Sequence, residues 1–318
     1  MAIKTRSKAT KSRPATLLIL SLFLLCCSSE PAPQSSNNSS SSVDNERVTK
    51  LRSDLKKIEP FFKPMGKPGQ FDWLASHNEP GQTFEEYINS NPTLPTEERK
   101  TIYVLPLGKF NSKEKEIIDI TGGYLEAFYG LPVKELPRQE LKRPTEGDDL
   151  RKLPYSNIVQ IRTGYIMDSI MAPQLPRDAA AMIALTNEDL FPDPTMFFVF
   201  GQASFEKRVG VWSLNRLEKN TDRDTFLRRT LKIASHETGH MFSMHHCTKY
   251  VCVMSGSNHM GEVDSLPIDA CPECMAKVAW LSGVSPKDRY DRLAAFCKKN
   301  GLTDEADEFT RKAKSVQE

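Results

Sequence analysis

The sequence predicts an α/β fold in which a buried sheet packs against helices. Two apolar, β-prone runs at residues 102–107 and 179–186 indicate buried strands, and residues 222–244 repeat apolar side chains at helical spacing. The 318 residues are 39% hydrophobic and 26% charged, which is typical of a globular protein with a sizeable core. This composition excludes collagen-like, fibrous and multi-span membrane proteins.

The first predicted strand leads into an amphipathic helix. Residues 102–107 are apolar apart from the hydroxyl of one tyrosine, as in a strand buried on both faces. Either Asn111 or Ser112 can cap the helix that follows, and Gly130 can end it. The polar residues 131–155 indicate a connection on the surface.

The second half of the predicted domain contains strands and one long helix. Residues 179–186 form the second apolar run, and residues 197–200 and 209–214 are expected to pair as strands across the loop between them. Asp222 suits the N-terminus of the helix at 222–244, where the helix dipole favours negative charge.

The N-terminus predicts an export signal. Residues 1–14 are basic, and residues 15–27 form an apolar run that would give about 20 Å of helix. This length is too short for the roughly 30 Å hydrocarbon core of a membrane but suits the apolar region of a signal peptide. An uncleaved N-terminal anchor is the alternative.

A cysteine pair at the end of this run indicates a lipid anchor. Cys26-Cys27 resembles the lipobox of bacterial lipoproteins, and we expect lipidation at Cys27 or, failing that, at Cys26. Residues 28–42 hold eight serines and no large apolar side chain, which predicts a flexible tether. We therefore expect an exported lipoprotein anchored in a membrane, in the periplasm or at the cell surface.

The charge of the expected mature chain argues against nucleic acid as a partner. The whole sequence carries a net charge of +2, but five of its 43 Lys and Arg residues lie in the first 26 positions, where no acid occurs. Without them the chain has a net charge of about −3. Such a chain shows no basic stripe that could neutralise phosphates.

A cluster of histidines predicts a catalytic metal site. Four of the six histidines lie within eleven residues, and His236 and His240 would share one face of a helix, one turn apart. Both could bind one Zn²⁺, while Glu237 could face metal-bound water without binding the metal. The chain would have to turn after His240 to bring back His246, and three histidines leave a fourth position open. A chance His-Glu-x-x-His on a solvated helix is the alternative.

Four cysteines predict a second, structural zinc site. Cys247, Cys252, Cys271 and Cys274 have the spacing C-x4-C-x18-C-x2-C, and the last pair forms the short knuckle common in zinc sites. Four thiolates would leave no open position, so this metal would stabilise the fold. Two disulfides are the alternative, since an exported protein can be oxidised. Cys297 is expected to be a small buried apolar residue.

Together these residues resemble the archaemetzincin family, whose pattern HExxHxxGxxHC continues into three further cysteines. Met254 matches the methionine of the Met-turn, which packs beneath the zinc-binding histidines. The resemblance spans roughly residues 100–290 and has two departures. Ser243 stands where the family has a glycine, which lets the helix end in a left-handed turn. A serine in that conformation costs about 1 kcal/mol. The spacer between Met254 and Cys271 is one residue shorter than usual.

The resemblance implies a metzincin-type zinc peptidase domain. This domain would contain a twisted mixed sheet of about five strands, an active-site helix and a C-terminal subdomain with the four-cysteine zinc. Two Zn²⁺ are implied, one catalytic at His236, His240 and His246 and one structural. The implied reaction is hydrolysis of a peptide bond by metal-activated water, with Glu237 as general base. The substrate would be a peptide or protein, lying extended along an edge strand near residues 209–214.

A second hypothesis is a surface-anchored zinc protein that binds peptides and cleaves them weakly or not at all. Only Ser243 supports it, and the intact Glu237 argues against it. We expect a monomer. The expected organisation is a signal peptide at 1–27, a tether at 28–42, a separate N-terminal region at 43–100, the catalytic domain at 101–290 and a C-terminal helical extension at 291–318.

Overall fold

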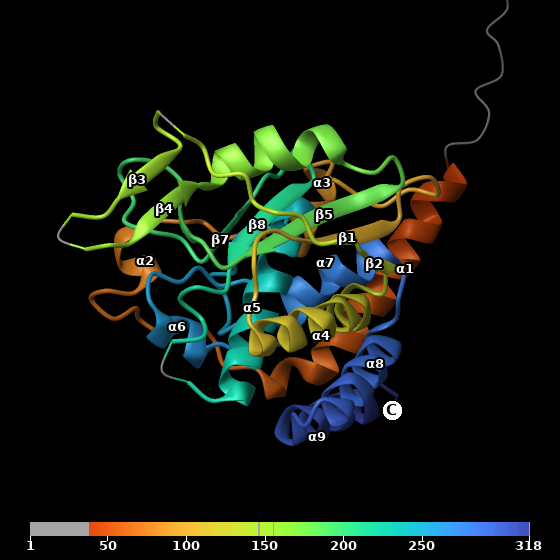
Figure 1. Ribbon diagram of the computed structural model, residues 1–318. Helices are drawn as coiled ribbons and strands as arrows, with labels where there is room; N and C mark the ends of the chain where they lie inside the picture. The colour runs from red at the N-terminus through yellow and green to blue at the C-terminus, as the bar shows by residue number, and fades with distance from the viewer. Residues whose placement is uncertain (1–37, 146, 155, 220, 318) are drawn as a thin grey trace, which may run out of the picture. The chain divides into compact units, whose positions relative to one another are not determined.

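The centre of the fold is a twisted five-stranded mixed sheet, ordered β2-β1-β5-β8-β7 (Figure 1). The first four strands of this order run parallel, and the edge strand β7 pairs antiparallel with β8. Every residue of β1, β5 and β8 is buried, as their apolar sequences require. The strands are β1 Thr101–Pro106, β2 Val133–Glu135, β5 Ala179–Thr186, β7 Gly201–Ala203 and β8 Val209–Ser213.

This computed structural model describes residues 38–317 except 146, 155 and 220. From Asp44 onward the chain forms one compact unit. The predicted signal peptide, both cysteines of the predicted lipobox and residues 28–37 of the predicted tether lie outside the described residues. Of the helices in the described part of the chain, none has the length and apolar character needed to cross a membrane.

Helices cover the two faces of the sheet and create two apolar cores. Helices α4, Ser112–Tyr129, and α5, Arg223–Met241, lie below the sheet in Figure 1, and the short helix Tyr165–Met171 lies above it. Side chains of β1 alternate between the two cores, with Ile102 on the α4 side and Tyr103 on the other. A three-stranded sheet, β3-β4-β6, lies beside the main one and consists of β3 Leu150–Lys152, β4 Val159–Arg162 and β6 Asp189–Phe191.

The remaining helices flank this framework. They are α1 Asn38–Ile58, the 3₁₀ turns Glu59–Phe61 and Ala172–Gln174, α2 Trp73–Ser76, α3 Phe84–Asn89, α6 Met260–Ser265, α7 Pro272–Ser282, α8 Pro286–Lys299 and α9 Thr303–Gln317.

Several sequence predictions are confirmed. Strands β1 and β5 lie where the apolar runs placed them. Asn111 caps α4 through a reciprocal pair of hydrogen bonds with Glu114, and Asp222 caps α5 by accepting a hydrogen bond from the backbone N–H of Thr225. Cys297 is fully buried in α8.

The strand predicted at residues 197–200 is wrong. The strand that pairs with β8 is Gly201–Ala203, within the segment predicted to be a loop. Strand β8 is therefore an interior strand, and β7 forms this edge of the sheet. Pairing with β8 overrides the higher β-propensity of the phenylalanine-rich residues 197–200. The predicted surface connection at 131–155 also contains β2 and β3, which are too short to show a sequence pattern.

The boundaries predicted around the catalytic domain need correction. Residues 44–100 are part of the compact unit, because Leu55, Phe84 and Tyr87 are buried in its main core. Helix α1 begins at Asn38, inside the predicted tether, and its C-terminal half packs on the core through Leu51, Leu55 and Ile58. The boundary predicted at residue 290 falls inside α8, which packs on α4.

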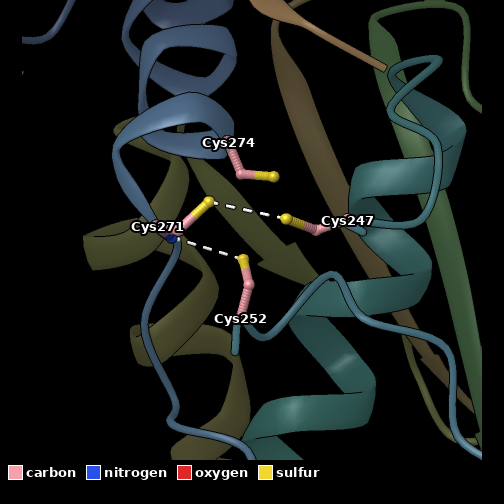
Figure 2. Close-up of side chains that lie close together, drawn as sticks. All are labelled: Cys247, Cys252, Cys271 and Cys274. Atoms are coloured by element: carbon pink, nitrogen blue, oxygen red, sulfur yellow. Dashed lines mark hydrogen bonds between the residues drawn. The ribbon is translucent and has the colours of Figure 1, made fainter. Parts of the chain in front are cut away.

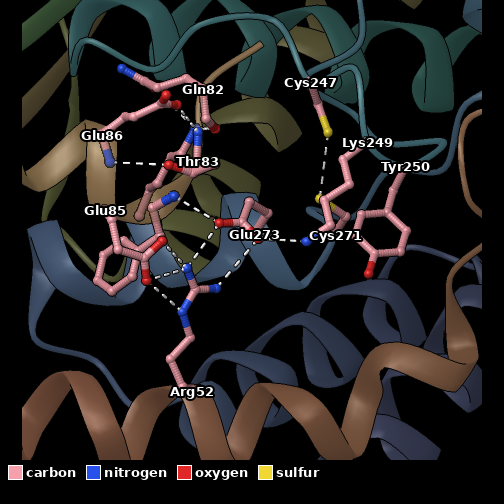
Figure 3. Close-up of polar contacts among 12 residues, drawn as sticks. Arg52, Gln82, Thr83, Glu85, Glu86, Cys247, Lys249, Tyr250, Cys271 and Glu273 are labelled. Carbon is pink, nitrogen blue, oxygen red and sulfur yellow. Dashed lines mark hydrogen bonds and ion pairs between the residues drawn. The ribbon is translucent and has the colours of Figure 1, made fainter. Parts of the chain in front are cut away.

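An ion-pair network holds the N-terminal helices to the cysteine knuckle (Figure 3). Glu273, between the two knuckle cysteines, accepts hydrogen bonds from Arg52 of α1 at 3.0 Å and from the backbone N–H of Phe84 at 2.7 Å. Lys249 lies 3.2 Å from the other oxygen of the same carboxylate, and Arg52 also pairs with Glu85. This network joins residues far apart in sequence in one partly buried cluster.

Candidate metal centre

Helix α5 presents the first two histidines to each other. His236 and His240 lie one turn apart on one face, and their Nε2 atoms are 2.9 Å apart. Tetrahedral zinc with bonds of 2.0–2.1 Å would hold such nitrogens about 3.3 Å apart. The helix therefore brings two donors almost to the separation that one metal ion requires.

A left-handed turn after the helix returns the third histidine. Ser243 has φ of 63°, so it adopts the conformation expected of the glycine it replaces. Its hydroxyl accepts a hydrogen bond from the backbone N–H of Thr93 at 3.0 Å, and its carbonyl accepts one from Gln82 at 3.2 Å. These contacts offset the strain of a serine in this region. The ring of His246 then lies 5.1 Å from that of His236 and 5.0 Å from that of His240.

Each of the three rings has its Nδ1 occupied by an acceptor. Nδ1 of His236 lies 2.9 Å from the carbonyl oxygen of Val253, and Nδ1 of His240 lies 2.6 Å from that of Met244. In His246 it lies 2.9 and 3.0 Å from the two carboxylate oxygens of Glu79. Because these acceptors need a proton on Nδ1, each Nε2 keeps its lone pair for a metal.

The protonation of His236 and His240 also suits metal binding. Burial, together with the neighbouring His246, lowers the pKa of His236 to about 3. Burial lowers the pKa of His240 well below its usual value. A neutral imidazole is the form that binds metal ions, and one nitrogen from each of the three rings lies within 4.8 Å of the others. The donor set therefore fits zinc with an open fourth position.

Met254 packs against the back of the active-site helix. Its side chain is fully buried, and a Cβ added to Gly239 would lie 2.7 Å from its sulfur. Glycine at this position therefore lets the helix and the Met254 loop approach closely. The same loop carries the carbonyl of Val253 that orients His236.

Glu237 lies between the histidines and the edge strand. Its side chain is buried, and burial raises the pKa of its carboxyl to about 8. A Cβ added to Gly201 of β7 would lie 2.6 Å from the carboxylate, so the absence of a side chain there makes room for it. Helix α5 and strand β7 together position this carboxylate.

The histidines and Glu237 line an open cleft of about 510 Å³. Phe198, Phe200 and Phe205 form part of its apolar wall, and Trp73 and Glu79 come from the N-terminal part of the chain. A volume of this size and apolar character is usual for a ligand site. The cleft runs beside β7, the edge strand of the sheet.

The four cysteines form a separate, closed cluster (Figure 2). All four are buried free thiols with sulfur atoms within 4.8 Å of one another, and the sulfurs of Cys247 and Cys271 are 3.6 Å apart. Zinc bonded to four sulfurs at about 2.3 Å would separate them by about 3.8 Å. The backbone N–H groups of Cys271 and Met254 point at the sulfur of Cys252, as they do toward thiolates. This donor set fits a zinc ion without an open position.

The other histidines have structural contacts. His77 stacks on Trp73 with ring centroids 3.7 Å apart, and His245 is exposed beside Phe205. His259 lies near Asp72 and Glu262, a third group with metal-binding side chains. Both oxygens of Glu262 already accept backbone hydrogen bonds, from Trp73 and Asn258. Nδ1 of His259 accepts from the backbone N–H of Glu262, so its Nε2 donates to Asp72 at 3.2 Å. We interpret this third group as a hydrogen-bonded clip.

Sequence reasoning missed two residues of the cleft, Glu79 and Trp73. Both lie among the prolines and glycines of residues 64–82, where no periodic pattern marks a site. Their spacing from the histidines, more than 150 positions, carries no signal in one sequence.

Known proteins resemble this chain in sequence and in fold. The model of peptidase family M54 matches residues 138–279, which excludes Glu79. Archaemetzincin-2 of Mus musculus is 30% identical over 282 residues, covering 76% of this chain and 78% of the mouse protein. Archaemetzincin-2 of Homo sapiens is 31% identical over 268 residues, covering 73% of each chain.

A solved structure agrees with these relatives. The crystal structure of archaemetzincin from Methanopyrus kandleri has a TM-score of 0.50 and 26% identity, covering 60% of this chain and 99% of that one. Two relatives thus resemble the chain in sequence over most of their length, and a third resembles it in fold over nearly all of its length. The site described above agrees with this relationship. The chain therefore belongs to the archaemetzincins, peptidase family M54, and is a zinc-dependent metallopeptidase.

Proposed function

We propose that His236, His240 and His246 bind a catalytic zinc and that Glu237 is the general base of peptide-bond hydrolysis. One observation carries the proposal: the three Nε2 sides converge at an open cleft, with a buried carboxylate next to them. Zinc, when bound, polarises the scissile carbonyl and acidifies a water molecule. Such a centre has the parts that hydrolysis requires.

The protein side chains supply the proton transfers. Glu237 accepts a proton from the attacking water as its oxygen bonds to the carbonyl carbon, and it returns that proton to the nitrogen when the C–N bond breaks. Burial raises the pKa of Glu237 to about 8 without metal, and the positive charge of a zinc ion bound beside it would lower that pKa and favour the ionised carboxylate that accepts the proton. The left-handed turn at Ser243 and the closeness of the His246 ring to that of His236 support an active enzyme over the alternative of a weakly active or inactive peptide-binding protein.

Strand β7 offers the place for the substrate. An extended peptide can add to the free edge of a sheet by backbone hydrogen bonds. We infer that it pairs with Gly201–Ala203, and not with residues 209–214, because the strand in that segment, β8, already has β5 on one side and β7 on the other. Its side chains would then reach the apolar wall near Phe198 and Phe200.

We further propose that the four cysteines bind a second, structural zinc. Four buried thiols without an open position can hold such an ion tightly, and the metal would fasten α7 to the loop after His246.

Replacing Glu237 with Gln should abolish hydrolysis and leave zinc in place. We expect a loss of about 10²–10⁴-fold in rate, because the amide cannot take the proton. Product formation from a peptide library, followed by mass spectrometry, measures the rate, and elemental analysis measures the zinc. Glu97→Gln, at a fully exposed carboxylate, is the control. A Glu237→Gln variant as active as the wild type would sink the assignment of the base.

Gly201→Ala should lower kcat while the fold remains intact. The added Cβ would lie 2.6 Å from Oε1 and 2.7 Å from both Cδ and Cγ of Glu237, so this side chain would have to leave its position. A displacement of about 1 Å can lower the rate by about 100-fold. Gly66→Ala is the control, because open space surrounds that position. Circular dichroism checks the fold, and an unchanged kcat would show that β7 does not position Glu237.

The purified protein should contain two zinc ions per chain. Elemental mass spectrometry should give about one zinc ion per chain for both His236→Ala and Cys271→Ser. The thermal unfolding midpoint should change little in His236→Ala and fall clearly in Cys271→Ser. The difference follows from the proposed roles of the two ions. A wild-type value of one, with none of the four cysteines open to thiol reagents after unfolding, would favour disulfides instead.

We also propose that the protein is exported and anchored by lipid at Cys27 or Cys26, outside the described residues. The support is the order of basic segment, apolar run, cysteine pair and serine-rich segment. A variant with both Cys26→Ser and Cys27→Ser, expressed in bacteria, should leave the membrane fraction or accumulate as precursor. Maturation and fractionation identical to the wild type would exclude lipidation.

A further inference from the structure

We propose that Glu79 is a positioning residue of the catalytic metal centre, whose carboxylate holds the His246 ring in the orientation and tautomer needed to bind zinc. The proposal rests on the proposed function, because it requires a metal at the three histidines. It concerns a residue outside the segment shared with the family model.

Glu79 contacts the side of the ring opposite to the expected metal. Both of its carboxylate oxygens lie within 3.0 Å of Nδ1 of His246, so they do not compete with a metal for Nε2. A carboxylate at this position keeps the proton on Nδ1 and raises the basicity of Nε2. The contact therefore favours metal binding at His246.

His246 needs this partner more than the other two histidines do. The Nδ1 atoms of His236 and His240 contact backbone carbonyls, and both residues lie in a rigid helix. His246 follows the left-handed turn beyond that helix, and its partner lies 167 positions earlier in the sequence. A ligand on irregular backbone gains its orientation from such an outer contact.

Trp73 restrains the same ring from another direction. Its ring meets that of His246 edge to face, with centroids 5.1 Å apart. A Cβ added to Gly256 would lie 2.4 Å from the indole, so glycine there allows Trp73 its position. The His246 ring is thus held by a hydrogen bond at Nδ1 and by an aromatic contact.

The segment that carries Glu79 is fastened on both sides. Before it, the backbone N–H of Trp73 donates to Glu262 at 2.9 Å. After it, Gln82 contacts the Ser243 carbonyl and the His245 N–H, each at 3.2 Å. Lys277 of α7 donates to the carbonyl of Gln82 at 2.6 Å. The chain on either side of Glu79 is therefore fixed by contacts that need no metal, which is what a positioning role demands.

The experiment measures zinc affinity at the two sites separately. Purified full-length protein is dialysed against solutions of buffered free Zn²⁺, and bound zinc is counted for the wild type, Glu79→Ala, Glu79→Gln and the control Glu97→Gln. Zinc binding at the four cysteines should be the same in all four proteins and therefore acts as an internal reference. Loss of an outer partner typically weakens metal binding by about 10–100-fold. We expect this shift in the histidine step of Glu79→Ala, a smaller shift in Glu79→Gln, which keeps an acceptor, and none in the control.

A cobalt-loaded sample gives a second readout of the same geometry. The visible absorption of Co²⁺ at the histidine site should change in Glu79→Ala and stay close to the wild type in Glu79→Gln. Unchanged zinc affinity and an unchanged spectrum in both variants would overturn the role of Glu79. Tighter zinc binding or faster hydrolysis in Glu79→Ala would also overturn it, because Glu79 would then restrain the site.

Two further outcomes separate this inference from the proposed function. If the wild type binds zinc at the histidines and the variants bind it there with the same affinity, only the positioning role of Glu79 is contradicted. The absence of any histidine step in the wild type contradicts the catalytic zinc, and with it the positioning role. Should Glu79→Ala fail to fold, the isosteric Glu79→Gln decides, since a shift in its histidine step with the cysteine step unmoved supports the proposal.

Discussion

The adjacency of His246 and Cys247 constrains the whole functional region. One residue faces the three-histidine centre and the next faces the four-cysteine cluster, so the two sites cannot move independently. The backbone N–H of Cys247 also donates to the carbonyl of Met254 at 2.8 Å, which ties this pair to the loop beneath the helix. A covalent link of one peptide bond thus makes the closed cluster the anchor for the third histidine.

The helix end makes this arrangement possible. Helix α5 has to stop soon after His240, because a continuing helix would carry His246 away from the other two rings. Ser243 makes that stop at positive φ, and its hydroxyl and carbonyl find partners in Thr93 and Gln82. A residue that is locally unfavourable is stabilised by tertiary contacts from the N-terminal part of the chain.

That N-terminal part contacts both the cysteine cluster and the histidine cluster. Arg52 pairs with Glu273 in the cysteine knuckle, and Glu79 contacts His246 in the cleft. A second buried network joins the segment before α7 to α8 and α9, where Asp269 pairs with Arg289 and Lys312. Charges buried in this way need all their partners, so they favour a single arrangement of the helices around the knuckle.

The sequence by itself determined the features that depend on local spacing. His236 and His240 share a face because helices have 3.6 residues per turn. Asn111 and Asp222 each cap a helix by accepting a hydrogen bond from the backbone N–H of the residue three positions later. The short, β-prone apolar runs of β1 and β5 predict strands because strands buried on both faces are apolar throughout. The grouping of the four cysteines also followed from their spacing.

Tertiary structure alone decided the features that depend on which surfaces meet. Strand β7 exists because Gly201–Ala203 find β8 as a partner, although their own β-propensity is low. Residues 44–100 join the core, and Glu79 and Trp73 reach His246, through contacts between positions more than 150 residues apart. The periodicity of a sequence does not predict such contacts, because long-range packing depends on the shapes of the folded segments that meet and not on the spacing of residues along the chain.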